Sequence, residues 1–241
     1  MANIKRICLW SGPRNISTTL MYSFAQREDT KVYDEPLYAH YLSNSNANEY
    51  HPGAQDILDS LEHNGEKVIA KMMTNQERPI LFYKNMTHHL LDLNLDFMKD
   101  VYNVILTRDP VEMLPSFDKV ITNPSMHDVG YAAHSELLDY FEAHNIEPIV
   151  LDSKRILLNP KKVLTELCDF IGIPFDENML QWQARAREED GSWAKYWYAN
   201  IHKSTRFLKY KPKTEPFPKH LEGLLNECVP HYNKLLKYAI G

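Results

Sequence analysis

Apolar runs of strand length alternate with helix-like patterns along this chain. Runs that have the length of buried strands lie at 4–11, 31–34, 101–107 and 148–151. Two further runs lie at 68–71 and 80–84, and at least one of them is expected to join the sheet. Helices are expected over 17–27, 54–64, 110–121, 128–145, 160–172 and 218–238. Strands that alternate with helices predict an α/β fold with a mainly parallel sheet, right-handed crossovers and flanking helices.

Composition is consistent with this fold and excludes some functions. The chain has 241 residues, of which 44% are hydrophobic, so we expect residues 1–241 to form one domain. A net charge of -5 argues against a general nucleic-acid binder. No signal peptide or membrane-spanning segment is visible, so no membrane partner is expected. Three cysteines without metal-ligand spacing indicate reduced thiols, a cytoplasmic location and no bound metal.

The sequence S-G-P-R-N-I-S-T-T-L at 11–20 joins the first predicted strand to the first predicted helix. A polar loop before a helix leaves backbone N–H groups unpaired, and the helix dipole adds positive potential there. The hydroxyl residues at 17–19 can donate hydrogen bonds to an anion, and Arg14 can supply a fixed positive charge. The arrangement predicts a phosphate-binding loop. The alternative is that Ser17 is a plain N-cap and that Arg14 is a solvated loop charge.

This loop differs from the Walker A pattern G-x-x-x-x-G-K-[ST] of ATP- and GTP-binding proteins. Ile16 stands where the last glycine is expected, and Ser17 stands in place of the lysine. The basic residue comes earlier in the loop, at Arg14. The loop therefore predicts a site for a nucleotide other than ATP or GTP.

A second polar motif follows the predicted strand 101–107. Arg108 stands at the strand end, and Ser116 comes eight residues later in the next predicted helix. Two helical turns bring a side chain back to the face beside the strand end, so the two residues are expected to lie together. Ligands of parallel sheets bind at such strand ends. The alternative is a local ion pair between Arg108 and Asp109, with Ser116 on the helix surface.

The two motifs together resemble those of sulfotransferases, which use 3′-phosphoadenosine-5′-phosphosulfate as donor. The first loop is similar to their 5′-phosphosulfate loop, P-[RK]-[ST]-G-[ST]-T, and departs from it at residues 15 and 16. The second motif is similar to the arginine and serine that bind the 3′-phosphate. The resemblance implies a P-loop NTPase-like, three-layer fold. It also implies that the donor is bound by Arg14, Asn15, Ser17, Thr18, Thr19, Arg108 and Ser116.

Three further stretches strengthen the resemblance. The sequence D-E-P-L-Y at 34–38 resembles an element that follows the second strand of carbohydrate sulfotransferases. The stretch 151–175 resembles a strand–helix run that ends in F-L-G-I-P-F late in many sulfotransferase domains. The sequence G-S-W at 191–193 is similar to a C-terminal G-D-W-K loop that covers the nucleotide. The resemblance extends from about residue 7 to residue 207.

The resemblance implies transfer of a sulfuryl group to a hydroxyl or amine of a small molecule. Negative charge builds on the bridging oxygen of the donor, and Arg14 is the candidate cation at that oxygen. The moving group carries less charge than a phosphoryl group, so no metal is expected. The acceptor is expected to bind along the variable stretches 38–50 and 116–131, which carry tyrosines and histidines.

A general base must take the proton that the acceptor loses. Glu35 is the first candidate, because it matches the glutamate of the carbohydrate-enzyme element, and Asp34 is the second carboxylate. His88 and His89 compete with them, because they follow a stretch where soluble sulfotransferases carry a K-T-H segment. Lys84 matches the lysine of that segment.

The stretch 190–207 predicts a lid over the nucleotide. Trp193 follows a glycine and can stack on an adenine. Ser204 and Thr205 stand beside basic residues and can reach the 3′-phosphate. Such a segment is expected to be loosely held when no nucleotide is bound, because the ligand is part of its packing surface.

Two other functions remain possible at this point. A small-molecule kinase would use ATP on the same fold, with magnesium held by an acidic strand end. The chain offers Asp109 for that role, but its loop has no lysine before the hydroxyl residues. A non-catalytic nucleotide-binding relative is the other alternative. Ile16 and the altered G-S-W stretch favour it, because both depart from the sulfotransferase pattern.

Overall fold

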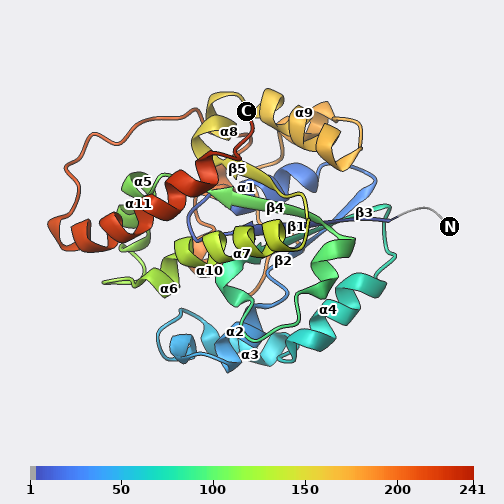
Figure 1. The fold of residues 1–241 in the computed structure, drawn as a ribbon. Coiled ribbons are helices and arrows are strands. Elements are labelled where there is room, and N and C mark those ends of the chain that lie inside the picture. The colour runs from blue at the N-terminus through green and yellow to red at the C-terminus, as the bar shows by residue number, and fades with distance from the viewer. Residues whose placement is uncertain (1–3) are drawn as a thin grey trace.

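A five-stranded sheet forms the centre of the computed structural model, which describes residues 4–241 (Figure 1). The strands are β1 (Lys5–Ser11), β2 (Thr30–Asp34), β3 (Ile80–Met86), β4 (Tyr102–Thr107) and β5 (Ile149–Asp152). Their order in the sheet is β2-β3-β1-β4-β5, and every neighbouring pair is parallel. The predicted α/β fold with a mainly parallel sheet is confirmed.

Helices cover both faces of the sheet (Figure 1). One face carries α1 (Ser17–Phe24), α8 (Ser153–Leu158) and α9 (Pro160–Ile171). The other face carries α4 (Gly65–Thr74) and α7 (Tyr131–Ala143), with α11 (Glu222–Leu236) packed along α7. Successive residues of a strand point to opposite faces. The central strand β1 therefore places Leu9 in the first layer and Trp10 in the second, both fully buried.

The remaining helices are short and build two smaller cores. One core is shared by α2 (Tyr38–Ser43), α3 (Ala54–Ser60) and α10 (Ala194–Trp197). The other joins α5 (Pro110–Phe117) and α6 (Met126–Val129) to α11. Single 3-10 turns are η1 (Asn46–Glu49), η2 (Thr87–His89), η3 (Asp96–Asp100), η4 (Glu177–Leu180), η5 (Ile201–Lys203) and η6 (Lys219–Leu221). None of the helices in residues 4–241 combines the length and hydrophobicity that a membrane crossing requires.

Some element boundaries differ from the predicted ones. At least one of the two short runs was expected to be a strand. The run 80–84 belongs to β3, whereas the run 68–71 lies inside α4. The predicted helix 128–145 is divided at Gly130, whose φ of 74° separates α6 from α7. The six-residue helix α2 was not predicted, because it is too short to show a helical repeat in the sequence.

The carboxyl ends of the strands meet at one edge of the sheet because all of the strands are parallel. Ser11 ends the central strand β1 and pairs in register with Met86 of β3. The loop 12–16 therefore starts in the middle of this edge. On the neighbouring pair of strands, Asp34 of β2 lies opposite Lys84 of β3. This edge gathers most of the polar residues that the sequence motifs singled out.

Replacing Leu9 with alanine should destabilise the protein strongly. Its side chain is fully buried between the sheet and the helices, so truncation leaves a cavity. The expected loss is about 2–5 kcal/mol of unfolding free energy. Leu158→Ala is the control, because Leu158 is 64% exposed. The control should change the unfolding free energy by less than about 0.5 kcal/mol. Urea unfolding followed by circular dichroism measures both, and equal losses would contradict this core.

Candidate active site

A cavity of about 390 Å³ opens at the carboxyl edge of the sheet. Its walls come from the loop after β1, the start of α1, the residues after β2, β3 and β4, and the stretch 193–208. The structure brings most of the predicted site residues together around it. Those that line it are Arg14, Ser17, Thr18, Thr19, Glu35, Lys84, His88, Arg108, Ser116, Trp193 and Ser204. Asn15 and Thr205 are not part of this lining.

The loop after β1 has the backbone of an anion-binding loop. Arg14 and Ile16 have φ values of 58° and 65°, in the left-handed region that favours glycine. Ile16 therefore holds the conformation that a glycine would adopt easily, at a cost of about 1–2 kcal/mol. Helix α1 begins at Ser17 with no side-chain cap. The Thr19 N–H donates to the Ile16 carbonyl at 3.0 Å, whereas the N–H groups of Ser17 and Thr18 have no helical partners and can bind an anion.

Side chains from other elements hold this loop in place. The Ser153 hydroxyl lies 2.8 Å from the Asn15 carbonyl oxygen and 2.9 Å from the Thr107 carbonyl oxygen and shares its one proton between them. The Asn15 side-chain amide donates to the Leu106 carbonyl at 3.2 Å. Asn15 thus supports the loop from beneath, and its predicted contact with the nucleotide stays a prediction.

Arg14 is a cation without a carboxylate partner. Its Nε donates to the Ser116 hydroxyl at 3.2 Å, which joins the first loop to helix α5. Among residues 4–241, no carboxylate lies within ion-pair distance of its guanidinium. Burial and the neighbouring positive charge of Arg108 both lower the pKa of Arg14. A bound anion would offset both effects, so the residue is suited to hold one.

Arg108 lies beside this loop and lines the same cavity as Ser116. One of its terminal nitrogens donates to the Arg14 carbonyl at 2.9 Å. Its other contacts are long ones to the Glu112 carboxylate, at 3.3 and 3.4 Å. The alternative pairing with Asp109 does not form, because the Asp109 carboxylate caps α5 through the Val111 N–H at 2.9 Å. Asp109 is therefore used by the helix start and does not line the cavity.

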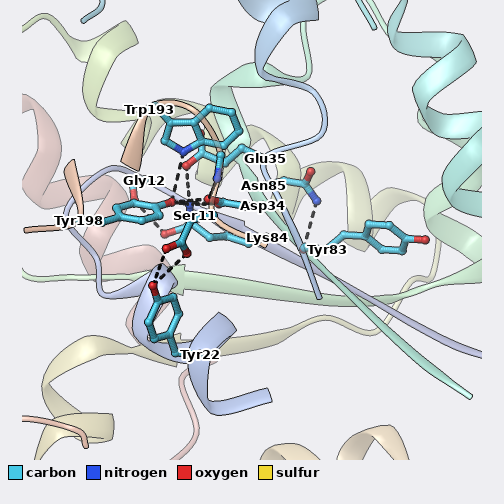
Figure 2. Close-up of polar contacts among 12 residues, drawn as sticks. Ser11, Gly12, Tyr22, Asp34, Glu35, Tyr83, Lys84, Asn85, Trp193 and Tyr198 are labelled. Carbon is cyan, nitrogen blue, oxygen red and sulfur yellow. Dashed lines mark hydrogen bonds and ion pairs between the residues drawn. The ribbon is translucent and has the colours of Figure 1, made fainter. Parts of the chain in front are cut away.

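A buried polar network around Lys84 also borders the cavity. Figure 2 shows its contacts. The Lys84 ammonium is fully buried and donates to Asp34 at 2.7 Å, to Glu35, and to the Tyr198 hydroxyl at 2.7 Å. The Tyr198 hydroxyl in turn donates to Asp34 at 2.8 Å. The indole N–H of Trp193 donates to the same hydroxyl at 3.3 Å. The network joins β2 and β3 to the C-terminal stretch.

Glu35 has the position and the pKa that a general base requires. Its backbone has a φ of 44°, and its N–H donates to the Lys84 carbonyl at 2.7 Å, which turns the side chain toward Lys84. Burial raises the pKa of Glu35 to about 7, with Lys84 opposing this shift and Asp34 adding to it. A carboxylate with a pKa near neutrality can accept a proton at the operating pH of most enzymes.

The two competing histidines are poor bases in this environment. His88 lines the cavity, and burial together with neighbouring imidazoles lowers its pKa to about 3. His89 is fully buried and stacks between Tyr38 and Tyr41, with ring centroids 4.8 and 4.6 Å apart. Burial also lowers the pKa of His89. Both rings are therefore neutral at pH 7, and Glu35 is the better suited of the three candidates.

The stretch 190–207 is anchored at several points. The Tyr22 hydroxyl donates to Asp190 at 2.8 Å, and the Trp182 indole donates to the Ser204 hydroxyl at 3.1 Å. Trp193 is 2% exposed and contacts the Tyr38 ring edge-on at the Glu35 end of the cavity. The predicted stacking of Trp193 on adenine, and the predicted contacts of Ser204 and Thr205 with the nucleotide, stay predictions, as does the lid.

Sequence reasoning did not single out three residues that line the cavity. Tyr198 lies inside the predicted lid 190–207, Asp128 lies inside the predicted acceptor stretch 116–131, and His51 lies just outside the stretch 38–50. Asp128 accepts hydrogen bonds from the Tyr50 hydroxyl at 2.7 Å and from the Ser125 N–H at 2.7 Å. The spacing S-x-x-D at 125–128 is the sequence signal of a helix start, but it does not reveal that the carboxylate also borders a cavity. No local pattern marks Tyr198 or His51.

Replacing Lys84 with methionine should destabilise the fold by about 3–5 kcal/mol, because it leaves Asp34 and Glu35 buried without a positive charge. Lys195→Met is the matched control. Lys195 pairs with Asp56 at 2.6 Å, and both side chains are about half exposed (57% and 52%). Removing such an exposed pair should cost no more than about 1 kcal/mol. Urea unfolding at pH 8 measures both variants, and a small loss for Lys84→Met would contradict the network.

Comparison with known proteins supports this description of the fold. The sulfotransferase from Alicyclobacillus acidocaldarius covers 96% of this chain with 94% of its own, at a TM-score of 0.56 and 11% identity. The sulfotransferase domain from the curacin biosynthetic pathway covers 94% of this chain with 98% of its own, at a TM-score of 0.50 and 14% identity. At these identities the likeness shows a common fold.

The sequence itself also has relatives. Branched-chain-amino-acid aminotransferase-like protein 2 of Arabidopsis thaliana is 37% identical over 228 residues, which covers 94% of this chain and 40% of that protein. The chain thus spans less than half the length of that relative. The family model described as "Sulfotransferase domain" matches residues 5–239, nearly the whole chain. The chain therefore belongs to the sulfotransferase family.

Proposed function

We propose that this chain transfers a sulfuryl group from 3′-phosphoadenosine-5′-phosphosulfate to a hydroxyl or amine group of a small molecule. The observation that carries the proposal is Arg14. It is a largely buried cation that has no carboxylate partner among residues 4–241 and lies at the uncapped start of α1. The chain belongs to the sulfotransferase family, and its loop is suited to bind an anion. Together these two facts support a ligand that is a nucleotide with two anionic groups.

The residues present fit the two anionic groups of this donor. The hydroxyls at 17–19 and the N–H groups of Ser17 and Thr18 would hold the 5′-phosphosulfate. Arg108 and Ser116, which each contact Arg14 and line the cavity, would hold the 3′-phosphate. The long contacts between Arg108 and Glu112 can be exchanged for stronger ones to a phosphate. ATP lacks a 3′-phosphate, so this pair would select against it.

The transfer breaks the bond between sulfur and the bridging oxygen of the donor and forms a bond from sulfur to the acceptor oxygen or nitrogen. The electron pair of the broken bond stays on the bridging oxygen, where negative charge increases. Arg14 and the N–H groups of the loop would stabilise that charge without rearranging, because both are already in place. The proton that the acceptor loses would pass to the Glu35 carboxylate.

The kinase alternative loses its support in this geometry. It requires a lysine in the loop, and the loop presents Arg14 at an earlier position. It also requires an acidic strand end that faces the phosphates, whereas Asp109 caps helix α5. The non-catalytic alternative is also less favoured. Ile16 keeps the left-handed conformation of the expected glycine, and Glu35 has the pKa of a working base.

Replacing Arg108 with alanine should weaken binding of 3′-phosphoadenosine 5′-phosphate by about 10- to 100-fold, because a charge-assisted contact to the 3′-phosphate is lost. Binding of AMP should change much less. The Arg108 contact with the Arg14 carbonyl supports the loop for both ligands, so the ratio of the two losses isolates the 3′-phosphate. Calorimetric titration measures both, with Arg185→Ala, an exposed arginine outside the cavity, as control. Equal losses for the two nucleotides would refute the assignment.

Replacing Glu35 with glutamine should lower kcat by about 100- to 10,000-fold, because the acceptor proton has no base to receive it. In the unmodified protein, kcat/KM should fall tenfold per pH unit below a pH of about 7, since the base acts only when deprotonated. Product formation from 4-hydroxybenzyl alcohol as acceptor provides the measurement. Glu49→Gln, on the exposed turn η1, is the control. Unchanged turnover in Glu35→Gln would remove Glu35 from the mechanism.

A further inference from the structure

A short part of the predicted lid lies against the buried network, and we call it the Glu35 cover: residues 191–198. Its contacts converge on one carboxylate of the sheet, that of Asp34 (Figure 2). The Gly191 N–H donates to Asp34 at 3.2 Å, and the Tyr198 hydroxyl donates to it at 2.8 Å. The Trp193 indole N–H donates to the Tyr198 hydroxyl at 3.3 Å. Asp34 is therefore the point at which the cover is attached to β2.

The polar groups of this attachment complement one another. One oxygen of Asp34 accepts from Lys84 at 2.7 Å, and the other accepts from Gly191 and Tyr198. The Tyr198 hydroxyl gives its one proton to Asp34 and accepts from Lys84 and Trp193. Asp34 is thus occupied by three donors. This suits it to hold the cover in place and leaves Glu35 as the carboxyl group that can take a proton.

The closed cover requires a glycine at position 191. A Cβ atom on this residue would collide with the Trp193 ring, so the backbone approaches the ring as closely as only glycine allows. Trp193 is 2% exposed and packs edge-on against Tyr38. Because its surroundings are densely packed, the ring cannot move aside without displacing the cover.

The cover contributes to the burial of Glu35. The Lys84 ammonium donates to both Glu35 and the Tyr198 hydroxyl, and it lies 5.2 Å from the centre of the Tyr198 ring. Trp193 and Tyr198 also line the same cavity as Glu35, which is 6% exposed. Burial is the largest of the effects that set the pKa of Glu35 at about 7. Opening the cover would admit water and lower this pKa toward the ordinary range of a glutamate.

The ionisable groups around Glu35 leave burial as the main influence on its titration. They are Asp34 of β2, Lys84 of β3, Tyr38 of α2 and Tyr198 after α10. Burial raises the pKa of both tyrosines well above its ordinary value, so they stay neutral while Glu35 titrates. Lys84 lowers the pKa of Glu35 and Asp34 raises it, so these two charges act in opposite directions.

We propose that Asp34 and Tyr198 are positioning residues that hold the cover closed, and that Glu35 takes the proton of the acceptor only while the cover is closed. This inference rests on the proposed function and adds to it how the base is prepared. Neither residue takes the proton itself. Both act through the burial of Glu35 and through its partner Lys84.

Carbon-13 NMR of protein labelled at the glutamate side-chain carboxyl groups tests the inference without donor or acceptor. The resonance that is missing from Glu35→Gln identifies Glu35, and its midpoint in the unmodified protein should lie near pH 7. In Gly191→Ala the midpoint should fall by at least about one pH unit, because the new methyl group displaces Trp193 and opens the cover. This change removes no ionisable group. Gly223→Ala is the matched control, because its methyl group meets no atom within 4 Å, and its midpoint should stay unchanged.

Two further variants test the positioning residues themselves. Tyr198→Phe removes the hydroxyl that joins the cover to Asp34, and it should also lower the Glu35 midpoint by at least about one pH unit. Tyr196→Phe is its matched control, because Tyr196 lies in the same stretch and is 43% exposed. Asp34→Asn keeps only one acceptor oxygen for three donors, so amide hydrogen exchange of 191–198 should become faster. The exposed Asp59→Asn is its control.

Each of three results overturns the inference. They are a Glu35 midpoint below about pH 5 in the unmodified protein, an unchanged midpoint in Gly191→Ala or Tyr198→Phe, and unchanged amide exchange in Asp34→Asn. The three variants change different residues, so the others decide if one of them does not fold. Failure of the proposed function is a separate result. It would appear as no binding of 3′-phosphoadenosine 5′-phosphate or as full turnover in Glu35→Gln, whatever the NMR midpoints are.

Discussion

The buried ammonium of Lys84 holds the site together. Burial alone would lower the pKa of Lys84, but Asp34 and Glu35 raise it well above its ordinary value, so the group remains charged. The same charge compensates the two carboxylates, which would otherwise repel each other where they are buried. Tyr198 completes the network from the C-terminal stretch. One side chain therefore fixes three distant segments and places Glu35 against the cavity.

The groups that line the cavity differ in charge. Arg14, Arg108 and the unpaired N–H groups at the start of α1 supply positive potential. Glu35 and Asp128 supply carboxyl groups, and His88 supplies a neutral imidazole. Under the proposed function, an anionic donor would gain favourable interactions beside the two arginines, and the proton of the acceptor would pass toward Glu35.

The loop after β1 shows that backbone conformation can be kept when the expected residue is not. Ile16 occupies the place of a glycine in the sulfotransferase pattern, yet it adopts the left-handed conformation that favours glycine. A β-branched residue resists this conformation, so the surrounding contacts must hold it. The Ser153 and Arg108 hydrogen bonds to the loop carbonyls supply such support. A comparison of residue identities alone would therefore underestimate how similar this loop is to the sulfotransferase pattern.

Much of the fold and about half of the site follow from local patterns in the sequence. The alternation of strands and helices is local information, and it predicts the parallel sheet and the meeting of strand ends at one edge. The motif around Arg14 and the spacing from Arg108 to Ser116 are also local, because they depend on one loop and one helix. The structure brings Arg14, Arg108 and Ser116 into the lining of one cavity, and their contacts with a nucleotide stay predictions.

The arrangement of the residues around Glu35 depends on the tertiary structure alone. Lys84 and Asp34 are 50 residues apart, and Tyr198 and Asp34 are 164 apart, so no local pattern links them. The choice between Glu35 and the histidines also depends on burial, which raises the pKa of a carboxyl group and lowers that of an imidazole. A sequence shows which groups can titrate. Their desolvation and their neighbours, which set the outcome, exist only once the chain has folded.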